Sequence, residues 1–94
     1  MRQLSHERLD VYQKSTRFLA LTAAILDNLP KGNATLSDQL KRASLSIILN
    51  IAEATGRTSR ADNRRHFAIA CGSALECAAV LDACRILELV INPL

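Results

Sequence analysis

The sequence predicts an all-α protein, a single domain over residues 1–94 built from three helices in an antiparallel, up-down order. Hydrophobic residues make up 49% of the chain and aromatic residues only 3%, so the core must consist of Leu, Ile, Val and Ala, which suits closely packed helices. Glycine occurs three times and proline twice, so turns are few and the elements are long. A chain of this length fits one small domain.

The first helix is predicted over about residues 6–29. Ser5 is a suitable N-cap, and Glu7 places a carboxylate in the first turn, where the helix dipole favours it. Apolar residues repeat with heptad spacing in two adjacent rows, which are Val11, Phe18 and Ile25, and Tyr12, Leu19 and Leu26. Segment 30–33, which contains a proline and a glycine, ends the helix in a turn.

The second helix is predicted over about residues 36–55. Thr35 and Asp38 match a loose form of the capping box, in which the side chain of the first residue caps the helix. Gly56 is a good C-terminal stop.

The third helix is predicted over about residues 60–91. Ser59 and Asp62 match the same loose capping pattern. No helix breaker follows before Asn92 and Pro93, so this helix should be the longest of the three.

A narrow polar stripe runs along the second helix between two apolar faces. Its residues form directed hydrogen bonds, and they are Gln39, Arg42, Ser46, Asn50, Glu53 and Arg57. A polar stripe is usually a solvated face, but in that case the second apolar face, with Leu45 and Leu49, lies exposed in a monomer. The alternative is a stripe that is buried or interfacial, where each charge needs a partner.

The third helix offers that partner. Its small residues should let another helix approach closely, and they are Gly72, Ser73, Ala79 and Ala83. We expect Glu76, in the middle of this face, to pair with Arg42, because a guanidinium binds a carboxylate well. The expected structural polar network consists of Arg42, Ser46, Asn50, Glu53, Ser73 and Glu76.

Four arginines lie within nine residues where the second and third helices join: Arg57, Arg60, Arg64 and Arg65, opposed only by Asp62. With a net charge of +3, the chain permits nucleic-acid binding without requiring it. The cluster is either a solvated helix start or a functional surface. Basic groups at a helix start oppose its dipole, which favours a functional surface. Repeated around a ring, the arginines would form a positive rim for phosphate backbones.

The sequence lacks the patterns of common catalytic and metal sites. No paired Glu-x-x-His motif occurs, and neither His6 nor His66 has a cysteine or histidine at zinc-ligand spacing. Cys71 points away from His66 on the helical wheel, which disfavours a Cys–His nucleophile. No glycine-rich phosphate loop occurs. We therefore expect no enzyme activity, no metal and no cofactor.

The cysteine pattern and the N-terminal sequence favour a cytoplasmic location. Cys71, Cys77 and Cys84 are expected to be reduced core thiols on one helix. The N-terminal residues are polar, unlike a signal peptide. The apolar segment 74–91 carries four charged residues and is not expected to span a membrane.

Several motifs resemble the four-helix bundle family first noted as open reading frames in intervening sequences of bacterial large-subunit rRNA genes. The resemblance covers roughly residues 9–90 and is carried by 9-LDVYQ-13, Pro30, 39-QLKRA-43, Ser46-Ile47, 50-NIAE-53, Gly56-Arg57, Phe67, Ala70, Gly72-Ser73 and Glu76. It implies a fold similar to the accessory proteins of diversity-generating retroelements, which are pentameric barrels that bind nucleic acid and a reverse transcriptase. It also implies a cyclic homo-oligomer, favouring a pentamer, in which the motif residues are architectural.

The chain departs from this family at two places. Ala54 stands where members usually have glycine. The sequence ends at 91-INPL-94, where members turn into a fourth helix, so either this member is naturally short or the sequence is truncated. In both cases we expect three helices in this sequence, exposed apolar surface and self-association.

Two functions remain open. The first is a non-enzymatic oligomeric accessory protein that binds RNA or DNA through the arginines of segment 57–65 with little sequence specificity. The alternative is a structural protein–protein interaction module, for example a partner of a polymerase or reverse transcriptase, with no nucleic-acid binding of its own.

Overall fold

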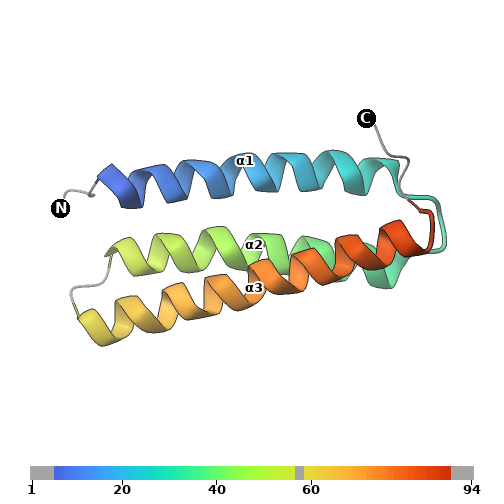
Figure 1. The fold of residues 1–94 in the computed structure, drawn as a ribbon. Coiled ribbons are helices and arrows are strands. Elements are labelled where there is room, and N and C mark those ends of the chain that lie inside the picture. The colour runs from blue at the N-terminus through green and yellow to red at the C-terminus, as the bar shows by residue number, and fades with distance from the viewer. Residues whose placement is uncertain (1–5, 57–58, 90–94) are drawn as a thin grey trace.

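The structure, a computed structural model, describes residues 6–56 and 59–89, apart from the side chain of His6. It contains three helices, α1 (His6–Asn28), α2 (Ala34–Gly56) and α3 (Arg60–Ile86), which lie side by side (Figure 1). The described residues include no strand. The all-α prediction is confirmed.

The start of α2 differs from the prediction. The helix begins at Ala34, because the carbonyl oxygen of Asn33 accepts a hydrogen bond from the amide of Ser37 at 3.0 Å. Thr35 therefore lies inside the first turn and does not cap it. The side chain of Asn33 donates to the carbonyl oxygen of Pro30 at 2.9 Å, which stabilises the preceding turn. Ser5, the predicted cap of α1, lies outside the described residues.

The start of α3 agrees with the prediction. Ser59 has an extended backbone, with φ −79° and ψ 132°, and its side chain accepts from the amide of Asp62 at 3.4 Å. This is the geometry of an N-cap.

The end of α3 at Ile86 corrects the predicted end at residue 91. The backbone amide of Leu89 donates to the carbonyl oxygen of Cys84 at 2.9 Å, and the backbone amide of Glu88 donates to the carbonyl oxygen of Arg85 at 3.1 Å. Glu88 has a left-handed backbone with φ 57°. These features form a Schellman turn, which satisfies the last carbonyl groups of a helix. Residues 90 and 91 lie outside the described part.

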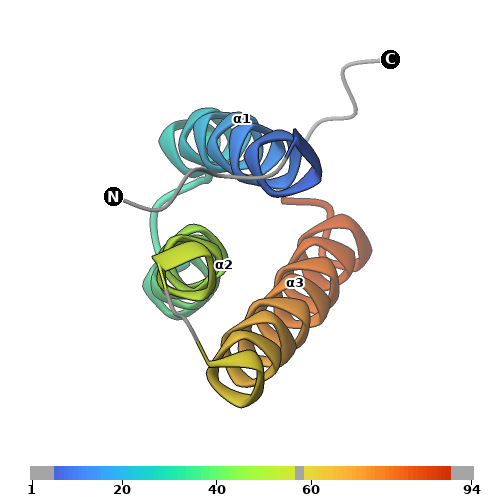
Figure 2. The ribbon, with the colours of Figure 1, turned by 90° about the vertical axis from the view of Figure 1, so that its left-hand side faces the viewer.

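α2 is the central element. It packs against both α1 and α3, whereas no Cα atom of α1 lies within 8 Å of a Cα atom of α3 over the described residues. The view along the helices shows this arrangement (Figure 2). The end of α1 and the start of α2 lie at one end of the molecule, and the start of α3 lies at the other (Figure 1).

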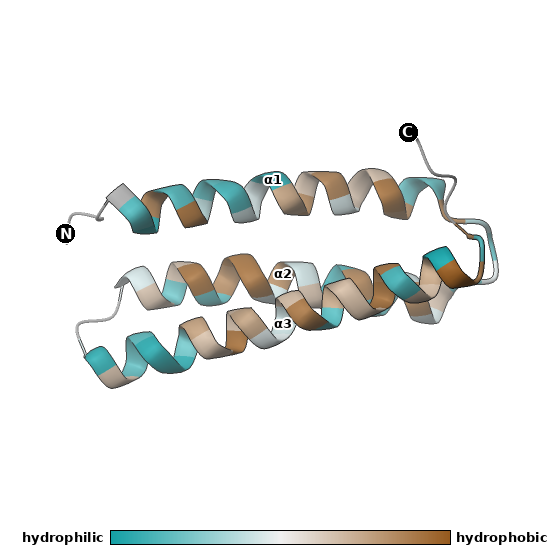
Figure 3. Ribbon diagram, in the orientation of Figure 1, coloured by the Kyte–Doolittle hydropathy of each residue, from teal (hydrophilic) through white to brown (hydrophobic). Residues whose placement is uncertain are grey.

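The buried core is small and follows the α2–α3 contact. Its fully buried cluster consists of Leu40, Ala43 and Cys77, against which Phe18 and Leu81 pack. The buried residues of α3 follow alternating steps of three and four, as in a heptad pattern, and they are Asn63, His66, Ala70, Ser73, Cys77 and, a full heptad further on, Cys84. The start of α3 is hydrophilic and its later turns are more apolar (Figure 3).

By length and composition alone, α3 could cross a membrane. This is weak support for a membrane span, because a core helix of a soluble protein passes the same test. The helix also buries polar side chains against α2, among them His66 and Ser73.

Candidate functional site

The polar stripe of α2 meets α3 through three side-chain contacts. Each contact joins one residue of α2 to one of α3: Arg42 to Glu76 at 2.5 Å, Ser46 to Ser73 at 2.8 Å and Asn50 to His66 at 2.9 Å. We call these six residues the polar row. As residue number rises along α2 it falls along α3, so the row follows the middle of the contact between the two helices.

The predicted contact between Arg42 and Glu76 is present and lies at the edge of the row. Nη2 of Arg42 also donates to Oε1 of Gln39 at 2.5 Å. The side chains of Arg42 and Glu76 are 62% and 39% exposed. Because water screens an ion pair this exposed, it contributes about 1 kcal/mol at most.

His66 is a buried member of the row that the sequence analysis missed. Nδ2 of Asn50 donates to the carbonyl oxygen of Ser46 at 2.8 Å, so its Oδ1 faces His66 as an acceptor. Nδ1 of His66 must therefore carry the hydrogen. Nε2 lies 3.4 Å from the guanidinium of Arg65, which can only donate, so Nε2 accepts. The signal was present in the sequence, because His66 and Ser73 are seven residues apart and share a helix face.

The row has no unsatisfied buried group within the described residues. Every buried side-chain nitrogen or oxygen there has a hydrogen-bond partner. Ser73 and His66 are buried, Ser46 and Asn50 are half-buried, and Arg42 is exposed. Glu53 lies three residues after Asn50 and is also exposed. The stripe is thus interfacial along its inner side and solvated along its outer side.

The small residues of α3 only partly behave as predicted. Ser73 is buried against α2. Gly72 and Ala79 are exposed, and no atom lies within 4 Å of the place where a side chain on Gly72 would begin. The expectation that this face as a whole receives another helix of the same chain is wrong, because Gly72 and Ala79 are turned away from α2.

Three of the four predicted arginines lie at the start of α3. Arg60, Arg64 and Arg65 are exposed, and Arg57 lies outside the described residues. Arg60 and Arg64 are four residues apart and share one face. Arg65 is directed differently, since its guanidinium reaches His66.

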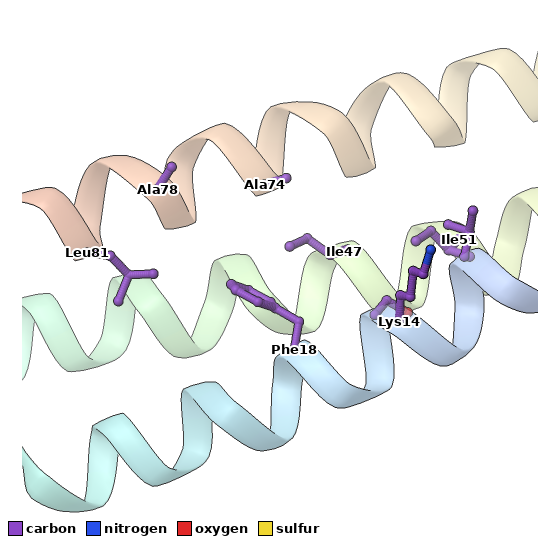
Figure 4. A pocket seen from close by; sticks show the side chains of 9 residues that line it. Lys14, Phe18, Ile47, Ile51, Ala74, Ala78 and Leu81 are labelled. Atoms are coloured by element: carbon purple, nitrogen blue, oxygen red, sulfur yellow. The ribbon is translucent and has the colours of Figure 1, made fainter. Parts of the chain in front are cut away.

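An apolar groove, which the sequence analysis did not find, lies between α1 and α3 and has α2 as its floor (Figure 4). Its volume is about 360 Å³. The apolar residues that line it include Val11, Phe18, Ile47, Ile51, Ala78 and Leu81, and Lys14 stands at its edge.

The cysteines differ from the prediction at one position. Cys77 and Cys84 are buried, whereas Cys71 is exposed and is not a core thiol. Burial, and next the nearby Glu76 carboxylate, raises the pKa of the Cys77 thiol. No group of three or more His, Cys, Asp or Glu residues in the described part could hold a metal ion.

Three packed helices, an interhelical polar row and an arginine-rich helix start define a small all-α protein. Residues 7–92 match the model of a family described as 23S rRNA-intervening sequence protein, and the chain belongs to this family. The match confirms the resemblance predicted from the motifs. No curated protein matches the chain, and no solved structure matches it.

Proposed function

We propose that the chain is a non-enzymatic, cytoplasmic accessory protein that binds nucleic acid as a cyclic homo-oligomer of antiparallel, up-down helical protomers. A pentamer is favoured by the resemblance to the pentameric accessory proteins of diversity-generating retroelements. The binding surface is the basic rim, formed by Arg57, Arg60, Arg64 and Arg65. The observation that carries the proposal is the exposure of Arg60, Arg64 and Arg65 together at one end of the molecule.

The physical basis is charge. The backbone amides at a helix start favour anions, and arginine side chains add charge and hydrogen-bond donors that match phosphate. No aromatic residue lies between Arg60 and Arg65 to stack on bases. Binding therefore depends on phosphate charge and shape, with little sequence preference.

The test is titration of labelled RNA and DNA duplexes of unrelated sequence at low and high salt. The wild type should bind each with similar affinity and lose affinity steeply as salt rises. Changing Arg60, Arg64 and Arg65 to Glu should abolish binding. A variant with Arg60→Glu and Arg64→Glu alone tests the rim without disturbing the contact of Arg65 with His66.

The matched control reverses exposed cations elsewhere, with Lys31→Glu and Lys41→Glu. This control lowers the net charge by as much as Arg60→Glu with Arg64→Glu does, and it should keep most of the affinity for nucleic acid. If binding survives the triple arginine change, the rim is not the binding surface.

A second function is favoured by the apolar groove and by the exposure of Leu45 and Leu49 on α2. In this function the chain is a structural module that binds a partner protein, such as a polymerase or reverse transcriptase, without contacting nucleic acid. Apolar contacts do not weaken as salt rises, so a complex that survives high salt and the triple arginine change supports this function.

A further inference from the structure

The three described arginines of the basic rim differ in how they are held. The side chains of Arg60 and Arg64 form no hydrogen bond or ion pair with another described residue. Nη2 of Arg65, in contrast, lies 3.4 Å from Nε2 of His66. Asp62 stands three residues before Arg65 and carries the opposite charge, yet no ion pair joins these two described residues. The guanidinium of Arg65 is therefore directed to the imidazole of His66.

A series of hydrogen bonds fixes the imidazole that contacts Arg65. Nδ2 of Asn50 donates to the backbone carbonyl oxygen of Ser46 at 2.8 Å, which leaves Oδ1 of Asn50 as the acceptor for His66. Nδ1 of His66 donates to this oxygen at 2.9 Å, so Nε2 is the acceptor for Arg65. Each group donates to the next, from Arg65 on α3 to the backbone of α2. The series therefore ends on the rigid backbone of a helix.

The imidazole is buried, whereas the guanidinium that it contacts is open to solvent. His66 is only 8% exposed, and a buried ring with both nitrogens bonded cannot turn without leaving polar atoms unpaired. Arg65 is exposed. A guanidinium carries several N–H donors, and the contact with the imidazole uses only one of them. Arg65 is thus held in place while most of its donors remain available to a ligand.

We propose that Asn50 and His66 are positioning residues for Arg65, and that Arg65 is the pre-ordered phosphate contact of the rim. This inference rests on the nucleic-acid binding of the proposed function and assigns different roles to its arginines. Immobilising a flexible side chain on binding weakens affinity by about two- to tenfold. Arg60 and Arg64 incur this loss when they contact phosphate, whereas Arg65 is already held before the ligand arrives.

The position of the held guanidinium also matters, because it lies beside the contact between two helices. Asn50 belongs to α2 and His66 to α3, so a phosphate bound to Arg65 has a defined place relative to both helices. Arg60 and Arg64, which share one face of α3, supply charge that attracts nucleic acid without a fixed place. Phosphate contacts set the position of a protein on a duplex, and a held donor sets it more narrowly than a flexible one.

The first test needs no nucleic acid. Nitrogen-15 relaxation of the arginine Nε–H groups at neutral pH reports side-chain motion on the picosecond to nanosecond timescale. In the wild type, Arg65 should be more ordered than Arg60 and Arg64. His66→Leu should make Arg65 as mobile as the other two, whereas His66→Gln should keep it ordered, because one amide supplies both a donor and an acceptor. An Arg65 side chain in the wild type that is as mobile as Arg60 and Arg64 overturns the proposal.

Asn50→Ala tests the same contact from the neighbouring helix. Without Oδ1 of Asn50 the imidazole loses the acceptor that orients it, so Arg65 should become more mobile although α3 is unchanged. Asn28→Ala is the matched control, because Asn28 is exposed and its side chain bonds within its own helix. Circular dichroism checks that both variants are folded. If Arg65 keeps its order in folded Asn50→Ala, Asn50 is not a positioning residue.

The second test is a double-mutant cycle on the affinity for a labelled RNA duplex. His66→Leu should weaken binding by about two- to tenfold, as expected when a held side chain becomes flexible. In an Arg65→Ala background the same change should cause no further loss, because the side chain that His66 positions is gone. In an Arg60→Ala background, the matched control, the full loss should return. A loss that persists with Arg65→Ala means that His66 acts through the fold alone, and it overturns the proposal.

The two tests separate this inference from the proposed function. A mobile Arg65 in a protein whose nucleic-acid binding depends on the rim overturns the positioning by His66 and leaves the function standing. An ordered Arg65 in a protein that binds no nucleic acid establishes the contact and overturns both the function and the phosphate role of Arg65. An ordered Arg65 together with coupled losses of affinity supports the proposal in full.

Discussion

Nδ1 of His66 on α3 lies 2.9 Å from Oδ1 of Asn50 on α2, in the contact between the two helices. The side-chain nitrogen of Asn50, Nδ2, donates a hydrogen bond to the backbone carbonyl oxygen of Ser46. If α3 slid along α2 by one turn, His66 and Asn50 would lose each other as partners, and the buried His66 would be left without its acceptor. The pair therefore favours one alignment of the two helices.

Asn50→Ala should lower the free energy of unfolding by about 1–3 kcal/mol, because His66 is left buried without its acceptor. Urea unfolding followed by circular dichroism measures the change. Asn28→Ala is the matched control, since Asn28 is exposed and its side chain bonds only to its own helix. Equal losses in the two variants would show that the contact with His66 contributes nothing.

The ion pair between Arg42 and Glu76 should contribute little. A double-mutant cycle with Arg42→Ala and Glu76→Ala should give a coupling free energy of about 0.2–1 kcal/mol, because both side chains are well exposed. The coupling should shrink as salt is raised. A coupling above about 2 kcal/mol, independent of salt, would mean that another copy covers the pair in solution.

Glu88→Gly should stabilise the protein by up to about 1 kcal/mol. Glu88 has a left-handed backbone, which costs a residue with a side chain about 1–2 kcal/mol and costs glycine little. Part of that gain is offset by the greater freedom of glycine in the unfolded chain. Thermal unfolding measures the change. Leu87→Gly is the control and should destabilise the protein, because Leu87 has φ −82°, which does not favour glycine. A loss of stability in Glu88→Gly would contradict the turn geometry.

The Cys77 thiol should make the protein less stable in alkali. Burial, and next the charge of Glu76, raises the pKa of Cys77 above its ordinary value of 9.0, so the folded state holds this proton more tightly than the unfolded state. The resulting stabilisation is complete below about pH 9 and is lost as pH rises through the raised pKa.

Unfolding free energies at about pH 8 and about pH 10 test this assignment. The decrease between the two values should be smaller in Cys77→Ala than in the wild type. Cys71→Ala should behave like the wild type, because Cys71 is exposed. If Cys77→Ala lost as much unfolding free energy between the two pH values as the wild type does, Cys77 would not be the cause of the loss.

Local patterns predicted much of the helix layout, and the misses have physical causes. The cap at Ser59 and the pairing of Arg42 with Glu76 depend on side-chain chemistry that is visible in the sequence. The end of α3 was missed because the turn at Glu88 uses neither glycine nor proline. His66 was missed because its neighbours in sequence are charged, while its burial depends on α2. The groove depends on how three helices are spaced, which periodicity within each helix does not record.

The central place of α2 has a consequence for how the molecule opens. Since α1 packs mainly on α2 over the described residues, and every side-chain contact of the polar row joins α2 to α3, α1 can separate without breaking the row. Local opening of this kind has its own free energy, smaller than that of complete unfolding. The backbone amides of α1 should therefore exchange their hydrogens with solvent sooner than the amides of α2 and α3 that lie beside the row.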